Sequence, residues 1–201
     1  MLYRRGLDDG ACERIADATL RDDCWTHRTS VDKKPHCDQT STPVATGECW
    51  FVYAEATLDP SACPNATPFA DDCALHVLSV GFRALGEPGT TPGTHEEEVA
   101  RRVVSAGLRV DDPRPWSAWY RQVLSGSVPF DRGACAAVSD PMRQESCRRT
   151  GIALYSDRLN YARDRGLYPC DGGPLPSVLV RTPDPELDAL VAARSDLCPA
   201  R

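Results

Sequence analysis

The chain has 201 residues, of which 41% are hydrophobic and 26% are charged, and its formal net charge is −6 at pH 7. These fractions are close to those of ordinary globular proteins and exclude wholesale disorder. The negative charge and the dispersal of basic residues into short pairs argue against a nucleic-acid-binding face, and no apolar run approaches the ~18–20 residues of a membrane-spanning helix.

The ten cysteines are the most informative residues. No Cys-x-x-Cys pair occurs, which disfavours zinc ribbons, thioredoxin-like sites and iron–sulfur clusters. An even number of widely spread cysteines favours structural disulfides formed in an oxidising compartment, so we expect a periplasmic or extracellular protein. Because "MLYRRGLDDG" lacks the hydrophobic centre of a signal peptide, either the protein is cytosolic or a leader preceded Met1. The cysteines favour the second alternative, with a signal peptide or a lipoprotein signal and its lipid anchor both open.

In chain order, the first eight cysteines form four closely spaced pairs: Cys12/Cys24, Cys37/Cys49, Cys63/Cys73 and Cys135/Cys147. Near the middle of each pair stands an Asp or Thr, followed in three of the four by proline: Asp17, Thr42, Thr67 and Asp140. Such a residue caps a helix, and proline at the first helical position sacrifices no hydrogen bond. In the first pair Thr19 is a competing cap, with Asp22 three residues later.

Each pair therefore predicts a helical hairpin, with a short helix before the cap and a longer one after it that carries the second cysteine. Facing positions in a tight hairpin can supply the Cα separation of about 4.4–6.8 Å that a disulfide needs. We expect each pair to staple its own hairpin. The rival pattern joins Cys24 to Cys37 and Cys49 to Cys63, but it leaves Cys73 to reach Cys135 across a long insertion.

The insertion contains the same signal without cysteines. Asp112–Pro113 is a helix start, and the offsets of the cysteines from their caps fall here on Gly107 and Trp119. We interpret this stretch as a hairpin that has lost its staple, with a first helix opened by Thr94. We expect that Trp116, Trp119 and Tyr120 do not all face inward on one helix, and that Trp116 or Tyr120 is exposed as a partner surface.

Beyond residue 135 the pattern predicts one long helix in the fourth hairpin and a final helix opened by Pro183 or Pro185. Cys170 and Cys198 remain, and pairing them ties that helix back across a Gly/Pro-rich loop. The expected fold is all-α, with stacked antiparallel hairpins and a loop-rich C-terminal segment. We expect one domain, 1–201, with three paired hairpins in 10–85, an insertion with a cysteine-less hairpin in 86–134, and the fourth hairpin and last helix in 135–201.

Candidate sites for chemistry are few. Cys24/His27 and Cys73/His76 form Cys-x-x-His pairs, each on one helix face, and a metal-handling protein for zinc or copper is therefore an alternative. Oxidised cysteines offer no thiolate, so the structural interpretation is preferred. The stretch "LSGSVP" does not match a nucleophile elbow, and "GEPGTTPG" lacks the lysine of a phosphate loop. No catalytic residue, metal ligand or cofactor is expected.

Cysteine-stapled helical hairpins resemble two known groups: the coiled-coil-helix proteins with CX9C spacing, matched here by Cys63 and Cys73, and the secreted Sel1-like cysteine-rich repeats. The resemblance covers about residues 10–85 and 135–160 and transfers no functional residue. It implies a scaffold that binds a partner, by analogy only. We therefore expect a non-enzymatic protein-binding module or accessory subunit, with no nucleic-acid partner. An enzyme whose site is assembled from dispersed residues is the other alternative.

Overall fold

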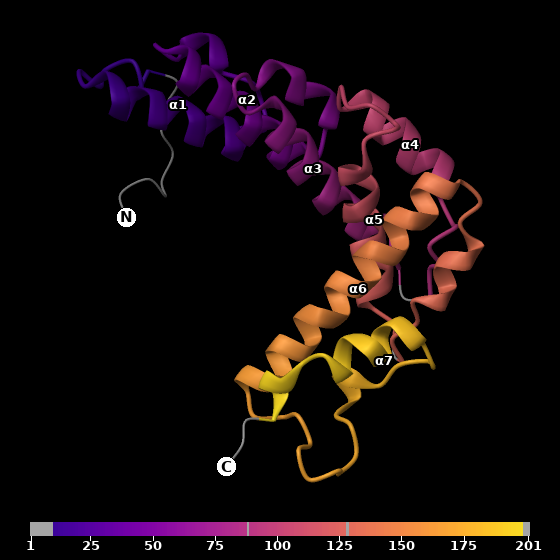
Figure 1. The fold of residues 1–201 in the computed structure, drawn as a ribbon. Helices are drawn as coiled ribbons and strands as arrows, with labels where there is room; N and C mark the ends of the chain where they lie inside the picture. The colour runs from indigo at the N-terminus through magenta and orange to yellow at the C-terminus, as the bar shows by residue number, and fades with distance from the viewer. Residues whose placement is uncertain (1–9, 88, 128, 199–201) are drawn as a thin grey trace. The chain divides into compact units, whose positions relative to one another are not determined.

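The computed structural model describes residues 10–87, 89–127 and 129–198, and its seven α-helices in that part of the chain (Figure 1) are α1 (Ala18–Asp32), α2 (Pro43–Thr57), α3 (Ala70–Leu85), α4 (Glu96–Ser105), α5 (Pro113–Ser125), α6 (Pro141–Asp164) and α7 (Pro185–Ala192). Short 3-10 helices lie between them: η1 (Cys37–Gln39), η2 (Pro60–Asn65), η3 (Gly133–Ala137), η4 (Ser177–Leu179) and η5 (Ser195–Leu197). Within the described ranges, extended pairing is limited to an isolated bridge between Phe130 and Arg181. The expected all-α class is confirmed. None of these helices is both long enough and apolar enough to cross a membrane.

The chain divides into two compact units, which differ from the expected single domain. The first comprises Met1–Gly81 with Arg101–Arg109, and the second comprises Phe82–Ala100 with Val110–Arg201. Helices α3 and α4 each contribute residues to both units. For that reason the expected sub-regions, which follow the order of the chain, do not coincide with the compact units.

Disulfides join the five cysteine pairs that the spacing predicts: Cys12–Cys24, Cys37–Cys49, Cys63–Cys73, Cys135–Cys147 and Cys170–Cys198. Their Cα–Cα distances lie between 5.4 and 5.7 Å. The rival pairing is therefore wrong. In three hairpins the first arm is a 3-10 turn rather than an α-helix, because only a few residues separate the first cysteine from the cap. In the first unit, Trp25 packs on the Cys12–Cys24 disulfide.

Four helices begin at the expected caps, whose side chains accept a backbone N–H of the first turn: Asp17 in α1, Thr42 in α2, Asp112 in α5 and Asp140 in α6. Helix α3 departs from this pattern. It begins at Ala70, three residues after Thr67, and the Thr67–Pro68 peptide bond is cis. The Cys63–Cys73 loop is two residues shorter than the loops of the other three stapled hairpins, which leaves fewer residues for a helix before its second cysteine.

One hydrogen bond recurs at a fixed offset from these caps. The side chain four residues after the cap donates to the carbonyl two residues before it: Arg21 to Ile15, Trp116 to Val110 and Gln144 to Val138. In the second hairpin the hydroxyls of Thr40 and Thr46 occupy these two offsets and bond each other at 2.8 Å. Trp116 belongs to the hairpin without cysteines. The turn around Asp112 therefore has the same hydrogen bond as the stapled turns, although no disulfide holds it.

Gly107 has a local structural role that needs no lost staple. Gly107 has φ 77° and ends α4. Its N–H bonds the carbonyl of Val104, and the N–H of Leu108 bonds that of Val103. This is a Schellman motif, in which glycine is favoured because the residue after the helix is left-handed. The glycine is therefore explained by the end of the preceding helix. Nor does Thr94 open α4, which begins at Glu96 after a left-handed His95 (φ 61°).

Trp116 and Tyr120 are not a partner surface, because both are fully buried, as is Trp119. The expectation was wrong because residues spaced i, i+3 and i+4 lie on one helix face, so all three aromatic side chains can pack inward together. Helix α6 lies along α5, the guanidinium of Arg143 lies 4.0 Å from the Trp116 ring centroid, and Phe82 contacts Trp119 from another element.

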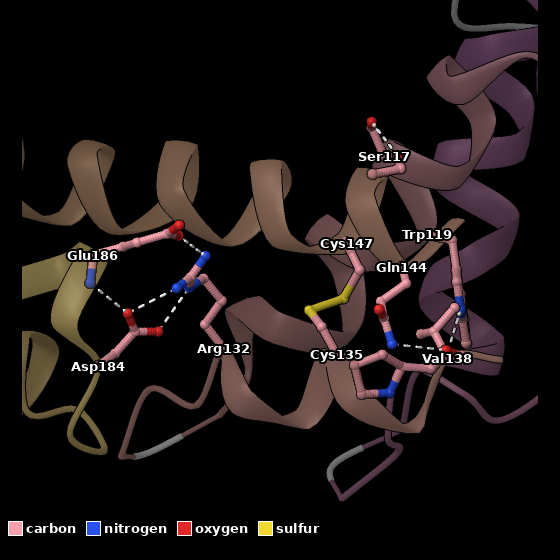
Figure 2. The surroundings of a disulfide bond; sticks show 11 residues. Ser117, Trp119, Arg132, Cys135, Val138, Gln144, Cys147, Asp184 and Glu186 are labelled. Atoms are coloured by element: carbon pink, nitrogen blue, oxygen red, sulfur yellow. Dashed lines mark hydrogen bonds and ion pairs between the residues drawn. A yellow bond between two sulfur atoms is a disulfide. The ribbon is translucent and has the colours of Figure 1, made fainter. Parts of the chain in front are cut away.

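The C-terminal segment is held to the fourth hairpin by a buried ion pair, shown with the Cys135–Cys147 disulfide in Figure 2. The Nε and Nη2 atoms of Arg132 each donate to Asp184 at 2.7 Å, and its Nη1 donates to Glu186. Asp184 also caps α7, which begins at Pro185 as one of the two expected starts. Hydrogen bonds from Arg132 hold the pKa of Asp184 below its ordinary value. Gly151 leaves room for the stem of Arg132, since an added Cβ would lie 2.7 Å from its Cγ.

Candidate functional site

A hollow of about 440 Å³ lies in the second unit, at the C-terminal end of α5. It is lined by a loop that follows α3, by the last residues of α5, and by the segment that follows α5: residues 86, 87 and 89–92, residues 122–127, Asp131 and Ala134. We refer to it as the α5-end pocket. Its volume is in the range of small-ligand and side-chain pockets.

The loop wall of the pocket is tied closely to its neighbours. An added Cβ on Gly86 would lie 2.7 Å from Cγ of Gln122, and one on Gly93 would lie 2.5 Å from the carbonyl oxygen of Ala137. Glycine is required at both positions because the backbone approaches another element more closely than a side chain permits. The indole Nε1 of Trp119 donates to the carbonyl of Pro92 at 3.3 Å. These contacts fix the loop against α5 and η3.

The opposite wall is positioned by the isolated bridge. The N–H of Phe130 donates to Val180 and the N–H of Thr182 donates back to the carbonyl of Phe130. Thr182 then donates through its Oγ1 to Oδ1 of Asp131 at 3.0 Å. The carboxylate of Asp131 is therefore set at the pocket by a backbone pairing rather than by a free loop.

The floor of the pocket is apolar. Pro92, Val123 and Leu124 are buried, and all of them line the hollow. The carbonyl of Leu124 accepts from both the N–H and the Oγ of Ser127. The last carbonyls of a helix carry its partial negative charge, so the end of α5 adds a negative potential to this side of the pocket.

Glu87 and Asp131 are the ionisable residues among those that line the pocket, and the lining includes no lysine, arginine or histidine. Among the described residues, neither carboxylate forms an ion pair with a cationic side chain. Arg158 reaches the end of α5, where its Nη2 donates to the carbonyl of Ser125 at 2.9 Å. Its guanidinium lies over the ring of Phe130, 4.6 Å from the centroid, and it does not line the pocket.

The other candidates from the sequence have structural roles in the described chain. Cys24 and Cys73 are oxidised, so their Cys-x-x-His faces present no thiolate. His76 hydrogen-bonds Glu55 at 3.0 Å. No group of three or more potential metal ligands comes together within the described residues.

Tyr120 belongs to a buried polar cluster rather than to a surface. Its side chain is fully buried, and burial raises its pKa above the ordinary value. Arg143 forms an ion pair with Glu96 at 3.3 Å in the same cluster. Among the described residues, the hydroxyl of Tyr120 has no hydrogen-bond partner.

Two stretches line the α5-end pocket: the Gly/Pro-rich loop at residues 86–94 and the "SGS" segment at the end of α5. From the sequence, neither matched a phosphate loop or a nucleophile elbow. Glycines in a loop indicate that its backbone can approach another segment closely. They do not indicate which segment of the chain it approaches. No family model, curated protein or solved structure matches the chain. The function is therefore argued from the geometry of this pocket.

Proposed function

We propose that this protein is a non-enzymatic binding module or accessory subunit of a periplasmic or extracellular assembly. In this proposal the stapled hairpins are a rigid scaffold, and the α5-end pocket receives a side chain of a partner protein. The oxidising location is supported by the five disulfides, since such bonds persist outside reducing compartments. The resemblance to secreted cysteine-stapled repeats agrees with it by analogy.

The observation that carries the proposal is the lining of the pocket. It combines an apolar floor with hydroxyl and carboxylate groups, a composition typical of recognition sites. Nucleophilic and general-base catalysis need a nucleophile within hydrogen-bond reach of a base. Ser125 and Ser127, the hydroxyls nearest the helix end, instead donate to the backbone carbonyls of Gln122 and Leu124. Both hydroxyls are thus committed to ending α5.

Photo-crosslinking from the pocket tests the proposal. Gly126 lines the pocket, has φ −81°, and has no atom within 4 Å of an added Cβ, so a photoreactive amino acid fits there without strain. A matched control carries the same group at Arg149 of α6, whose side chain is 78% exposed and does not line the pocket. Both variants are expressed with a secretion leader in the native cells and irradiated.

The expected result is a light-dependent adduct with one discrete protein from Gly126 and none from Arg149. Unlabelled chain should compete with adduct formation, and the identified protein should bind the purified chain in solution. Adducts of equal yield from both positions, or none from Gly126, would contradict a partner-binding role for this pocket.

A further inference from the structure

We infer that the α5-end pocket selects a cationic side chain, a lysine or arginine presented by the partner protein. This inference rests on the proposed function, because it names the chemistry of the group that the pocket accepts. Its basis is the combination of apolar lining residues with carboxylates that no lining cation neutralises.

Three sources of negative potential meet at the pocket. Glu87 and Asp131 contribute carboxylates from two segments of the lining, and the C-terminal end of α5 contributes the partial charge of its last carbonyls. Oδ1 of Asp131 accepts from Thr182, and Oδ2 accepts no hydrogen bond within the described ranges. Oδ2 is therefore available to a donor that enters the pocket. The net charge of −6 adds a long-range attraction for basic partners.

Arg158 forms no described ion pair with Glu87 or Asp131. Its guanidinium is occupied by the carbonyls of Ser125 and Val178 and by the ring of Phe130. Because Ser125 lines the pocket, Arg158 offsets part of the charge of the helix end, and the two carboxylates remain the main source of negative potential. An incoming cation can still reach the two carboxylates, whereas an anionic group would have to approach them unpaired.

The apolar floor distinguishes a lysine or arginine from a hydrated metal cation. Val123 and Leu124 form an apolar surface beside the charged groups. The methylene stems of Lys and Arg cover such a surface while the charged head reaches polar groups. The hydroxyls of Thr90 and Thr91 line the same hollow and can accept from an ammonium or guanidinium group. The occupant that matches both features has a positive charge on an apolar stem.

Binding of blocked amino acids to the full oxidised chain tests the inference. The probes are N-acetyl-lysine N-methylamide, N-acetyl-arginine N-methylamide and, as a neutral isostere, N-acetyl-norleucine N-methylamide. The amide NMR signals of Gly86, Gly89 and Gly126, which line the pocket, report binding. We expect saturable shifts with one or both cationic probes and none with norleucine. Equal shifts with norleucine would overturn the role of charge.

The variant E87Q/D131N tests the two carboxylates, and E145Q/D157N removes the same charge from exposed positions of the second unit outside the pocket. We expect affinity for the cationic probe to fall at least tenfold in the first variant. The free energy of a tenfold change in affinity is smaller than that of one hydrogen bond to a charged group, and the variant removes two charged acceptors. It should change less than twofold in the control. Unchanged affinity in E87Q/D131N, with an unchanged unfolding curve, would overturn the inference.

Crosslinking separates this inference from the proposed function. If the Gly126 adduct persists at full yield in E87Q/D131N, the pocket binds a partner but does not select a cation, and the inference fails alone. If the cationic probe binds and no protein adduct forms, the pocket takes a free amine and the proposed function fails. If E87Q/D131N loses both the adduct and probe binding while E145Q/D157N keeps them, the proposed function and the inference are both supported.

Discussion

Removing the Cys135–Cys147 disulfide should destabilise the second unit strongly. Both cysteines are fully buried, and they are 12 positions apart in the sequence. The chain-entropy relation gives a loss of about 3 kcal/mol for opening a loop of this size. In the double variant C135A/C147A the buried sulfur atoms are also lost from a filled core, which adds to that figure rather than reducing it.

The Cys170–Cys198 bond gives a matched comparison in the same unit. Its ends are 28 residues apart, and the same relation assigns it about 3.6 kcal/mol. Both of these cysteines, however, are exposed and lie at the C-terminal end. A terminal segment can open without unfolding the rest. We therefore expect C170A/C198A to lower the free energy of global unfolding less than C135A/C147A does, against the order of loop lengths.

Denaturant unfolding followed by tryptophan fluorescence measures both losses. Trp116 and Trp119 belong to the second unit and Trp25 and Trp50 to the first, so W25F/W50F backgrounds report the second unit alone. A loss below about 1 kcal/mol in C135A/C147A, well under the range for removal of a native disulfide, would refute the reasoning. A larger loss in C170A/C198A would instead show that the C-terminal segment is integral to global stability.

Further predictions concern single residues. Arg132 holds the folded pKa of Asp184 below the ordinary value of 3.8. The stabilisation that the ionised carboxylate contributes is therefore present above that value and is lost as pH falls toward the folded pKa. Between pH 5 and 3, the free energy of unfolding measured in urea should fall more in the parent than in Asp184→Asn, and an equal fall in both would count against the ion pair. Leu58 ends α2 with φ 55° and is 48% exposed, so Leu58→Gly should raise the unfolding free energy by about 0.5–1 kcal/mol by removing left-handed strain; Leu58→Ala is the control that keeps the Cβ, and an equal gain there would contradict this cause. Tyr120→Phe should raise the thermal midpoint, because it removes a buried hydroxyl without a described partner; a fall of several degrees would show that the hydroxyl is bonded in solution.

Local features of this fold were predictable from sequence, because a cap and two cysteines within one hairpin fix each other's positions. Asp17 and Asp140 demonstrate this, since both begin their helices and both lie between the cysteines that are joined. Features that depend on other elements were not predictable. One such feature is the identity of Arg143 of α6 as the residue that covers Trp116. The joint burial of Trp116, Trp119 and Tyr120, by contrast, agrees with their spacing on one helix face. Gly107 is ambiguous in the sequence because an end-of-helix motif and a lost cysteine leave the same single glycine there.

The α5-end pocket was beyond sequence reasoning for the same physical cause. Glu87 and Asp131 are 44 positions apart in the sequence but line the same pocket. Their segments are positioned by the close approach of Gly86 to Gln122 and by the bridge between Phe130 and Arg181. Neither stretch carries a motif with defined spacing. Residue chemistry alone therefore gave no reason to join the two carboxylates.

The central claim is that every hairpin with a cysteine pair carries its own staple, and that these stapled hairpins form the scaffold of the chain. A disulfide map of the unreduced protein tests it most directly. Cleavage with trypsin and an Asp/Glu-specific protease cuts the chain between the members of every pair. The account predicts no free thiol and five linked peptide pairs, among them Cys12 with Cys24 and Cys135 with Cys147. A peptide linking Cys24 to Cys37, or Cys73 to Cys135, would contradict it.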